Sequence, residues 1–158
     1  NTASSLLPLH FYIDASQSMQ GFVATDDSVY ADTLRHLREN IVTAARYTPA
    51  LYKFSDTVIP QDDPLSSNIF SPKFYDQIDT SLTTLLTRIA NNTRIANNTA
   101  AGVLSVVVSD FVQSESGTDQ LSLASAFQQV VNPQNGTRPE ILLLGFRSKF
   151  QGTNAIVV

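Results

Sequence analysis

A short apolar run at Leu6–Ile13 constrains the fold of this chain more than any other feature. The run is almost uninterrupted and contains aromatic and β-branched residues, which is typical of a strand buried on both faces, as in parallel sheets. It ends abruptly at a polar loop, Asp14–Ser18. Val103–Ser109 is the most β-prone stretch of the chain, and Glu140–Phe146 predicts another buried strand. Ala155–Val158 could begin a last strand.

The segments between these predicted strands show the periodicity of helices. Ser28–Tyr47 and Thr80–Ala90 repeat apolar residues at helical spacing, and Leu121–Val131 predicts a third helix. Pro49 is expected to end the first helix. Each predicted helix begins at a residue suited to the N-cap position: Asp27 or Ser28, Asp79 or Thr80, and Thr118 or Asp119.

The remaining segments predict a hairpin and a loop, and one of them contains a duplication. Ala50–Phe54 and Thr57–Ile59 are two short strands of a predicted hairpin. Gln61–Lys73 is polar, contains prolines and is predicted to be a loop. Arg88–Thr93 is repeated letter for letter by Arg94–Thr99, which is too short for a solenoid repeat and lengthens a helix end or a loop. We assign this duplication no function.

The order of the elements favours an α/β fold. Strand, helix, hairpin, helix, strand, helix and strand follow one another along the chain. Such alternation predicts a doubly wound, mostly parallel sheet with right-handed crossovers and helices on both faces. The length suits a single domain over residues 1–158.

Composition excludes several classes of function. Ten basic and fourteen acidic residues give a net charge of -4 without any basic run, so a nucleic-acid partner is not expected. The absence of cysteine excludes disulfides, thiolate metal sites and a cysteine nucleophile. No apolar run approaches the ~20 residues that a membrane span needs, so this piece is expected to be soluble. The compartment stays open, with an extracytoplasmic location slightly favoured over a cytoplasmic one.

Oxygen-bearing side chains follow the predicted strands at the point where each strand ends. Asp14, Ser16 and Ser18 follow the first strand, Asp110 follows Val103–Ser109, and Thr80 opens a helix. In doubly wound sheets, ligands bind beyond the carboxyl ends of the strands. If the first strand and Val103–Ser109 are neighbours, these oxygens converge on one crevice.

The chemistry of this set indicates a hard divalent cation. Such ions prefer oxygen ligands, and Mg²⁺ takes six of them while keeping several waters. Three hydroxyl groups supply neutral oxygens, and Asp14 and Asp110 supply negative charge. With few carboxylates bound directly, an ion at this site keeps positive charge for a carboxylate from outside. The hydroxyl-rich set favours Mg²⁺ or Mn²⁺ over Ca²⁺.

The segment FYIDASQSMQGF resembles the first strand and metal-ion-dependent adhesion site of von Willebrand factor A domains, whose pattern is Asp-x-Ser-x-Ser. The segment ALYKFSD resembles the second strand of that family. The resemblance covers about Leu9–Phe146 and implies a doubly wound sheet with one antiparallel edge strand. It also implies that Thr80 and Asp110 complete the metal site. Gln17 and Phe111 depart from the pattern, because the family often has glycine at both positions.

Simpler interpretations stand beside these. An isolated Asp-x-Ser-x-Ser is more often a helix cap or turn, Asp110 could merely end its strand, and Thr80 could be only an N-cap. Thr83 and Thr84 compete with Thr80 for the role of ligand. Other polar residues are expected to be structural: solvated loop charges at Asp26, Asp27, Asp62 and Asp63, a packed imidazole at His10 and a surface imidazole at His36.

We expect a monomeric module that binds a protein partner by presenting a bound Mg²⁺ to an Asp or Glu of that partner. One alternative is a non-adhesive scaffold domain in a larger protein, with a structural or degenerate metal site. A metal-dependent hydrolase is the other, although no catalytic motif supports it, and we expect no enzymatic activity. No final helix of the family is evident after Val158, so we expect a domain that is truncated there or continues into another domain.

Overall fold

The first strand, β1 (Leu7–Asp14), lies inside a four-stranded sheet of order β3-β2-β1-β4. The structure is a computed structural model that describes residues 6–25, 27–43, 46–64, 66–98, 102–112, 120–132, 139–142 and 144–151. β1 pairs in parallel with β2 (Tyr47–Phe54) and with β4 (Leu104–Val108). β3 (Val58–Pro60) pairs antiparallel with β2 and forms one edge. The predicted mostly parallel sheet, with one antiparallel edge strand, is therefore confirmed.

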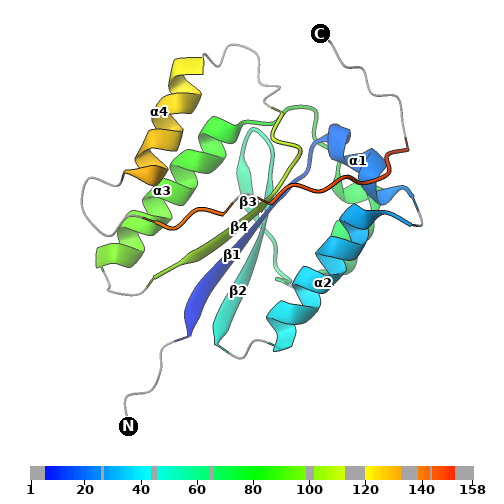
Figure 1. The fold of residues 1–158 in the computed structure, drawn as a ribbon, viewed down its shortest axis with the longest axis horizontal. Helices are drawn as coiled ribbons and strands as arrows, with labels where there is room; N and C mark the ends of the chain where they lie inside the picture. The colour runs from blue at the N-terminus through cyan, green and yellow to red at the C-terminus, as the bar shows by residue number, and fades with distance from the viewer. Residues whose placement is uncertain are drawn as a thin grey trace.

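Helices cover both faces of the sheet (Figure 1). On one side lie α1 (Gln17–Val23) and α2 (Val29–Thr43), and on the other lie α3 (Leu82–Asn98) and α4 (Gln120–Val131). Two 3-10 helices, η1 (Ser67–Phe70) and η2 (Pro72–Phe74), interrupt the segment that the sequence predicts as loop. The element order and the layering confirm the α/β class.

Alternating side chains of β1 build two separate cores. Phe11 and Ile13 pack in the cluster that contains Leu34 of α2, whereas Tyr12 packs with Leu85 of α3 in a second cluster. Successive residues of a strand point to opposite faces, so a strand covered on both faces is apolar almost throughout. This burial explains the uninterrupted apolar run that the sequence shows at this strand.

Helix boundaries differ from the predicted ones at α1 and α2. α1 begins at Gln17, inside the segment predicted as a polar loop. α2 ends at Thr43, so the prediction that it extends to Tyr47 and stops at Pro49 is wrong. Pro49 lies in β2, which is tolerated because β3 pairs only with residues 52–54 and leaves this part of β2 at a sheet edge.

The N-caps of two helices can be compared with the sequence. Ser28 caps α2 as predicted, because its Oγ accepts from the backbone N–H of Ala31 at 3.3 Å. Ser81, rather than Asp79 or Thr80, caps α3, and its Oγ accepts from the N–H of Thr84 at 3.2 Å. Thr118 and Asp119 lie outside the described residues. The hydroxyl of Thr80 donates to Oδ1 of Asp14 at 3.3 Å.

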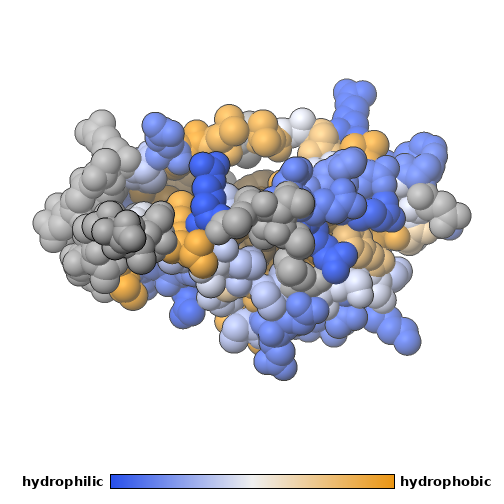
Figure 2. Space-filling model, turned by 90° about the horizontal axis from the view of Figure 1, so that it is seen from below, coloured by the Kyte–Doolittle hydropathy of each residue, from blue (hydrophilic) through white to orange (hydrophobic). Residues whose placement is uncertain are grey.

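The predicted strand at Glu140–Phe146 is wrong for its described residues, none of which is in a strand. Ile141 and Leu142 are exposed, Leu142 by 80 %. A strand needs a pairing partner, and this segment instead crosses from the α4 side of the sheet to α1 (Figure 1). Apolar side chains reach the surface elsewhere too, as separate patches on the face seen from below (Figure 2). Ala155–Val158 lies outside the described residues.

Contacts with α1 and α2 hold the far end of this crossing segment. The N–H of Gln151 donates to the carbonyl of Gly21 at 2.9 Å, and Phe150 packs edge-on against Phe22 with ring centroids 5.0 Å apart. Ser148 accepts through Oγ from the N–H of Tyr30 at 2.9 Å. Gly21 permits the approach, because a Cβ there would lie 2.3 Å from the Phe150 ring.

The duplicated segment falls in the last half of α3, which reaches Asn98. The first copy contributes Asn92, whose Nδ2 donates to the Tyr12 hydroxyl at 2.9 Å. Thr99 lies outside the described residues. The duplication therefore lengthens a helix, one of the two outcomes that the sequence allows.

Candidate metal centre at the carboxyl edge of the sheet

Asp14 is the last residue of β1 and lies at the centre of the candidate site. Its side chain is 0 % exposed. Oδ1 accepts from the backbone N–H of Ser16 at 2.9 Å and from the Thr80 hydroxyl at 3.3 Å. Oδ2 accepts from the Ser109 hydroxyl at 2.6 Å. Asp14 therefore joins three segments of the chain: the β1–α1 connection, the start of α3 and the end of β4.

Ser16 and Ser18 extend the cluster toward the surface. Ser16 occupies the N-cap position of α1, but its side chain makes no capping hydrogen bond. Its Oγ lies 2.9 Å from the Oγ of Ser18, and the Ser18 hydroxyl donates to Oδ2 of Asp110 at 2.8 Å. Ser16 is buried and Ser18 is exposed, so the line of hydroxyl groups runs from the interior outward.

The backbone around the two serines is fixed by the segment that precedes α3. Gln77 donates its N–H to the carbonyl of Ala15 at 3.0 Å and accepts from the N–H of Gln17 at 2.8 Å. Gln17, one of the two departures from the family pattern, has an exposed side chain and keeps this backbone bond. A glutamine at this position is therefore compatible with the compact loop that the motif needs.

The structure distinguishes among the three candidate threonines. Thr80 is buried and bonds to Asp14. Thr84 instead bonds through Oγ1 to Ser81 at 2.9 Å, and Thr83 lines a groove between α3 and α4. Thr80 is thus the threonine that the fold brings to the predicted site.

All five predicted residues meet at one edge of the sheet, and a sixth joins them. Ser109 was not singled out by the sequence, yet its hydroxyl makes the shortest contact to Asp14 given above and accepts from the N–H of Phe111 at 2.9 Å. Its position immediately before Asp110, at the end of a predicted strand, was one sign of this role, but the side to which its hydroxyl points depends on the pairing of β4 with β1. Whether the set holds a metal is a question of its chemistry.

Burial raises the pKa of Asp14 above its usual value of 3.8. The hydrogen bonds from Ser109 and Ser16 oppose this shift, and the negative charge of Asp110 adds to it. Within the described residues, no ion pair involves either carboxylate. A buried carboxylate without a cationic partner is stabilised by a proton or by a bound cation.

The donor set fits a hard cation. It contains two carboxylates and several hydroxyl groups, all oxygen donors, and no imidazole or thiolate, which Zn²⁺ prefers. Among the described residues, no group of three or more His, Asp or Glu side chains is placed to hold a metal. A metal site in that part of the chain therefore needs oxygen donors besides carboxylates, and this cluster offers hydroxyl groups.

Phe111, the second departure from the family pattern, adopts φ 57°. This is the left-handed conformation that glycine enters freely and other residues enter at about 1–2 kcal/mol. Phe111 therefore preserves the backbone shape that glycine would give. Bulky residues in this conformation concentrate at functional sites.

The described residues that are expected to be structural lie in the predicted environments. His36 and the described acidic residues of the two loops, Asp27, Asp62 and Asp63, are exposed. Asp27 pairs with Lys149. His10 is half-buried against the ring of Tyr52, and burial followed by the charge of Arg88 lowers its pKa. Asp26 lies outside the described residues.

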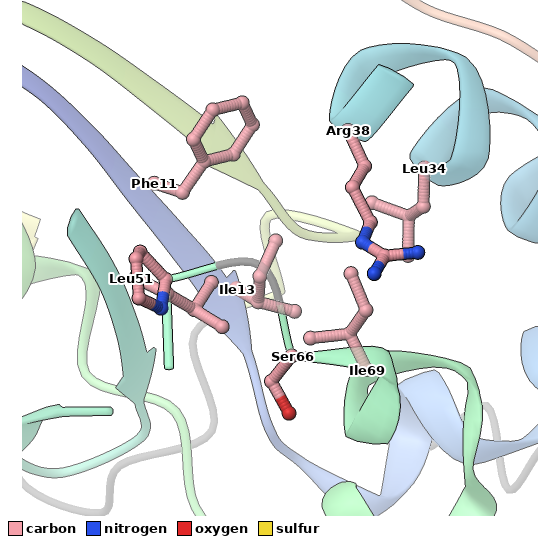
Figure 3. A pocket seen from close by; sticks show the side chains of 8 residues that line it. Phe11, Ile13, Leu34, Arg38, Leu51, Ser66 and Ile69 are labelled. Atoms are coloured by element: carbon pink, nitrogen blue, oxygen red, sulfur yellow. The ribbon is translucent and has the colours of Figure 1, made fainter. Parts of the chain in front are cut away.

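A small apolar cavity lies between the sheet and α2 and is separate from the site. Figure 3 shows Leu34 and Arg38 reaching from α2 toward Ile69, with Phe11 and Ile13 on β1. Its volume is about 20 Å³, which accommodates about one water molecule. The cavity is therefore a packing defect rather than a ligand site.

Comparisons with known proteins bear on the fold. No protein-family model matches the chain, and no curated protein matches it. Among solved structures, the chain is similar to an aerotolerance-related membrane protein from Bacteroides fragilis NCTC 9343, solved with multiple mutations to serines. The TM-score is 0.53 with 17% sequence identity, and the match covers 94% of this chain and 82% of that chain. In the described part of this chain, no helix combines the length and apolarity that a membrane span requires. The comparison supports the α/β fold.

Proposed function

We propose that this chain is a divalent-metal-dependent protein-binding module of the von Willebrand factor A type. One observation carries the proposal: five oxygen-bearing side chains that the motif predicts, from three distant segments, lie in one hydrogen-bonded cluster. These residues are Asp14, Ser16, Ser18, Thr80 and Asp110. Because the chain separates some of them by more than 90 positions, chance proximity is a poor explanation of the cluster.

Each residue has a role in holding Mg²⁺, or Mn²⁺ in its place. The hydroxyl groups of Ser16, Ser18 and Thr80 supply neutral oxygens, and Asp14 and Asp110 hold the ion directly or through water. A bound ion would supply positive charge to a carboxylate from a partner protein. The buried Asp14 anchors the inner side of the site, and the exposed Ser18 marks the side open to a partner.

We propose no catalytic role for the cluster of hydroxyl and carboxylate groups. A serine nucleophile needs a base within hydrogen-bonding reach. Ser18 donates to Asp110, the carboxylate that the proposal uses to hold the ion. The described contacts of His10 are with Tyr12, Tyr52 and Asn92 and not with Ser18. We therefore propose binding rather than hydrolysis.

The scaffold alternative is favoured by a different observation. The hydroxyl and carboxylate groups satisfy one another, so the cluster is held together by its own hydrogen bonds. A site of this kind could serve stability alone, without a partner. The two candidates differ in whether a bound ion keeps a position open for an external carboxylate.

Relaxation of water protons by Mn²⁺ separates the two. In the binding module, Mn²⁺ bound to the protein carries exchangeable water, and acetate, as a minimal carboxylate probe, lowers the relaxation enhancement when it displaces that water. Acetamide, which lacks the charge, serves as the control. An enhancement that acetate leaves unchanged would contradict the binding module and favour the scaffold. Ser16→Ala should abolish the bound Mn²⁺ signal in either case.

A further inference from the structure

Three large apolar side chains are exposed directly beside the candidate site. Ile78 is 79 % exposed, Phe111 52 % and Val112 57 %. Ile78 precedes Thr80 by two positions, and the other two follow Asp110. Single exposed apolar residues are common, but these three flank the site on both of the segments that complete it.

Hydrogen bonds to the site itself fix the backbone at Phe111 and Val112. The N–H of Phe111 donates to Oγ of Ser109 at 2.9 Å, and that hydroxyl donates to Asp14. The N–H of Val112 donates to Oδ1 of Asp110 at 3.0 Å. The positive φ of Phe111 is maintained within this arrangement. The backbone that carries the two apolar side chains is therefore held by Ser109 and Asp110 at the site.

The backbone beside Ile78 is held by the loop that carries the two serines. Its neighbour Gln77 exchanges backbone hydrogen bonds with Ala15 and Gln17, at 3.0 and 2.8 Å. These bonds tie the segment before Thr80 to the loop that carries the two serines. Ile78 thus projects from a fixed backbone next to the site rather than from an unanchored loop.

We propose that Ile78, Phe111 and Val112 form an apolar rim around the carboxylate-binding position. The partner segment then carries an Asp or Glu flanked by large apolar side chains. This inference rests on the proposed function. A carboxylate alone gives limited affinity, and the chain's net charge of -4 does not attract an acidic partner at long range. Burial of apolar side chains around the contact supplies the remaining affinity.

Four synthetic heptapeptides test the rim, with a central Glu or Gln and with Leu or Ser on both sides of it. Binding is measured by fluorescence anisotropy at saturating Mg²⁺. We expect the Leu-flanked Glu peptide to bind at least about tenfold more tightly than the Ser-flanked one. The triple variant Ile78→Ser, Phe111→Ser, Val112→Ser should remove that difference without changing Mg²⁺ affinity. Phe111→Asn is a milder second variant, because asparagine tolerates the left-handed conformation.

Ile95→Ser is the matched control, since Ile95 is 61 % exposed but lies about 20 Å along α3 from the end near the site. Equal affinity for Leu-flanked and Ser-flanked Glu peptides would overturn the rim and leave the proposed function standing. Failure of the Leu-flanked Glu peptide to bind at millimolar concentration would also overturn the apolar rim. A preference for Leu flanks without any preference for Glu over Gln would instead overturn the proposed function.

Discussion

At the scale of single residues, Asp14 combines full burial with a negative charge. Its carboxylate accepts hydrogen bonds from Ser16, Thr80 and Ser109, yet burial still raises its pKa. The folded state without metal therefore favours the protonated form relative to the unfolded chain. The stability that this group contributes is present at low pH and is lost as pH rises through the raised pKa.

Asp14→Asn should therefore stabilise the metal-free protein at neutral pH. The amide keeps the size of the side chain and removes the buried charge. The stabilisation should shrink as pH falls through the raised pKa of Asp14, and it should vanish below the usual carboxyl pKa, where Asp14 is neutral in the folded and unfolded states. Urea unfolding in the presence of chelator measures the change, with exposed Asp62→Asn as the control. A variant less stable than the wild type at neutral pH would contradict this account of Asp14.

The residues of the site were predictable to different degrees. Asp14, Ser16 and Ser18 follow one another in a recognisable pattern, and Asp110 ends the most β-prone stretch. Ser109 was missed because its role depends on the side to which β4 turns its last residues. That direction is set by pairing with β1 and not by local sequence.

At the scale of elements, close approach between α1 and the crossing segment depends on Gly21. Gly21→Ala would place a methyl group 2.3 Å from the Phe150 ring, so the ring must move away from Phe22. We expect the contact to be lost and the segment around Phe150 to become more accessible. Limited proteolysis and amide hydrogen exchange at Gln151 measure this loss.

Gly145→Ala is the control for that experiment, because a Cβ there meets nothing within 4 Å. It lies in the same segment, so it separates a general effect of alanine from the specific clash. Equal protection of Gln151 in both variants and the wild type would show that the Phe150 contact does not hold the segment.

Elements whose pattern is local were predicted well, and those set by distant contacts were not. β1, β4 and α2 follow from apolar runs and helical spacing. The apolar run at Glu140–Phe146 also predicts a strand from its local pattern, but strand formation depends on a pairing partner. Contacts near residue 150 lead the chain across to α1 instead, which no local pattern reveals.

At the scale of the whole molecule, the parallel sheet creates the site. β1 lies between β2 and β4, so its carboxyl end meets that of β4 at one edge. The start of α3 reaches the same edge through the pairing of Gln77 with Ser16. This topology explains why residues far apart in sequence could be predicted as one cluster. The similarity to a solved structure at 17% identity supports this fold. Support for metal binding comes from the site residues of this chain alone.

Calorimetric titration of Mg²⁺ and Mn²⁺ into the metal-free protein tests the central proposal most directly. The wild type should bind one ion, and Asp14→Asn and Ser16→Ala should each abolish the binding heat. Exposed Thr87→Ala, on α3 but outside the site, should bind as the wild type does. At a hundredfold excess over the dissociation constant, the ion should stabilise the fold by about 2.7 kcal/mol. No binding by the wild type, or undiminished binding by both site variants, would contradict a metal centre at Asp14, Ser16, Ser18, Thr80 and Asp110.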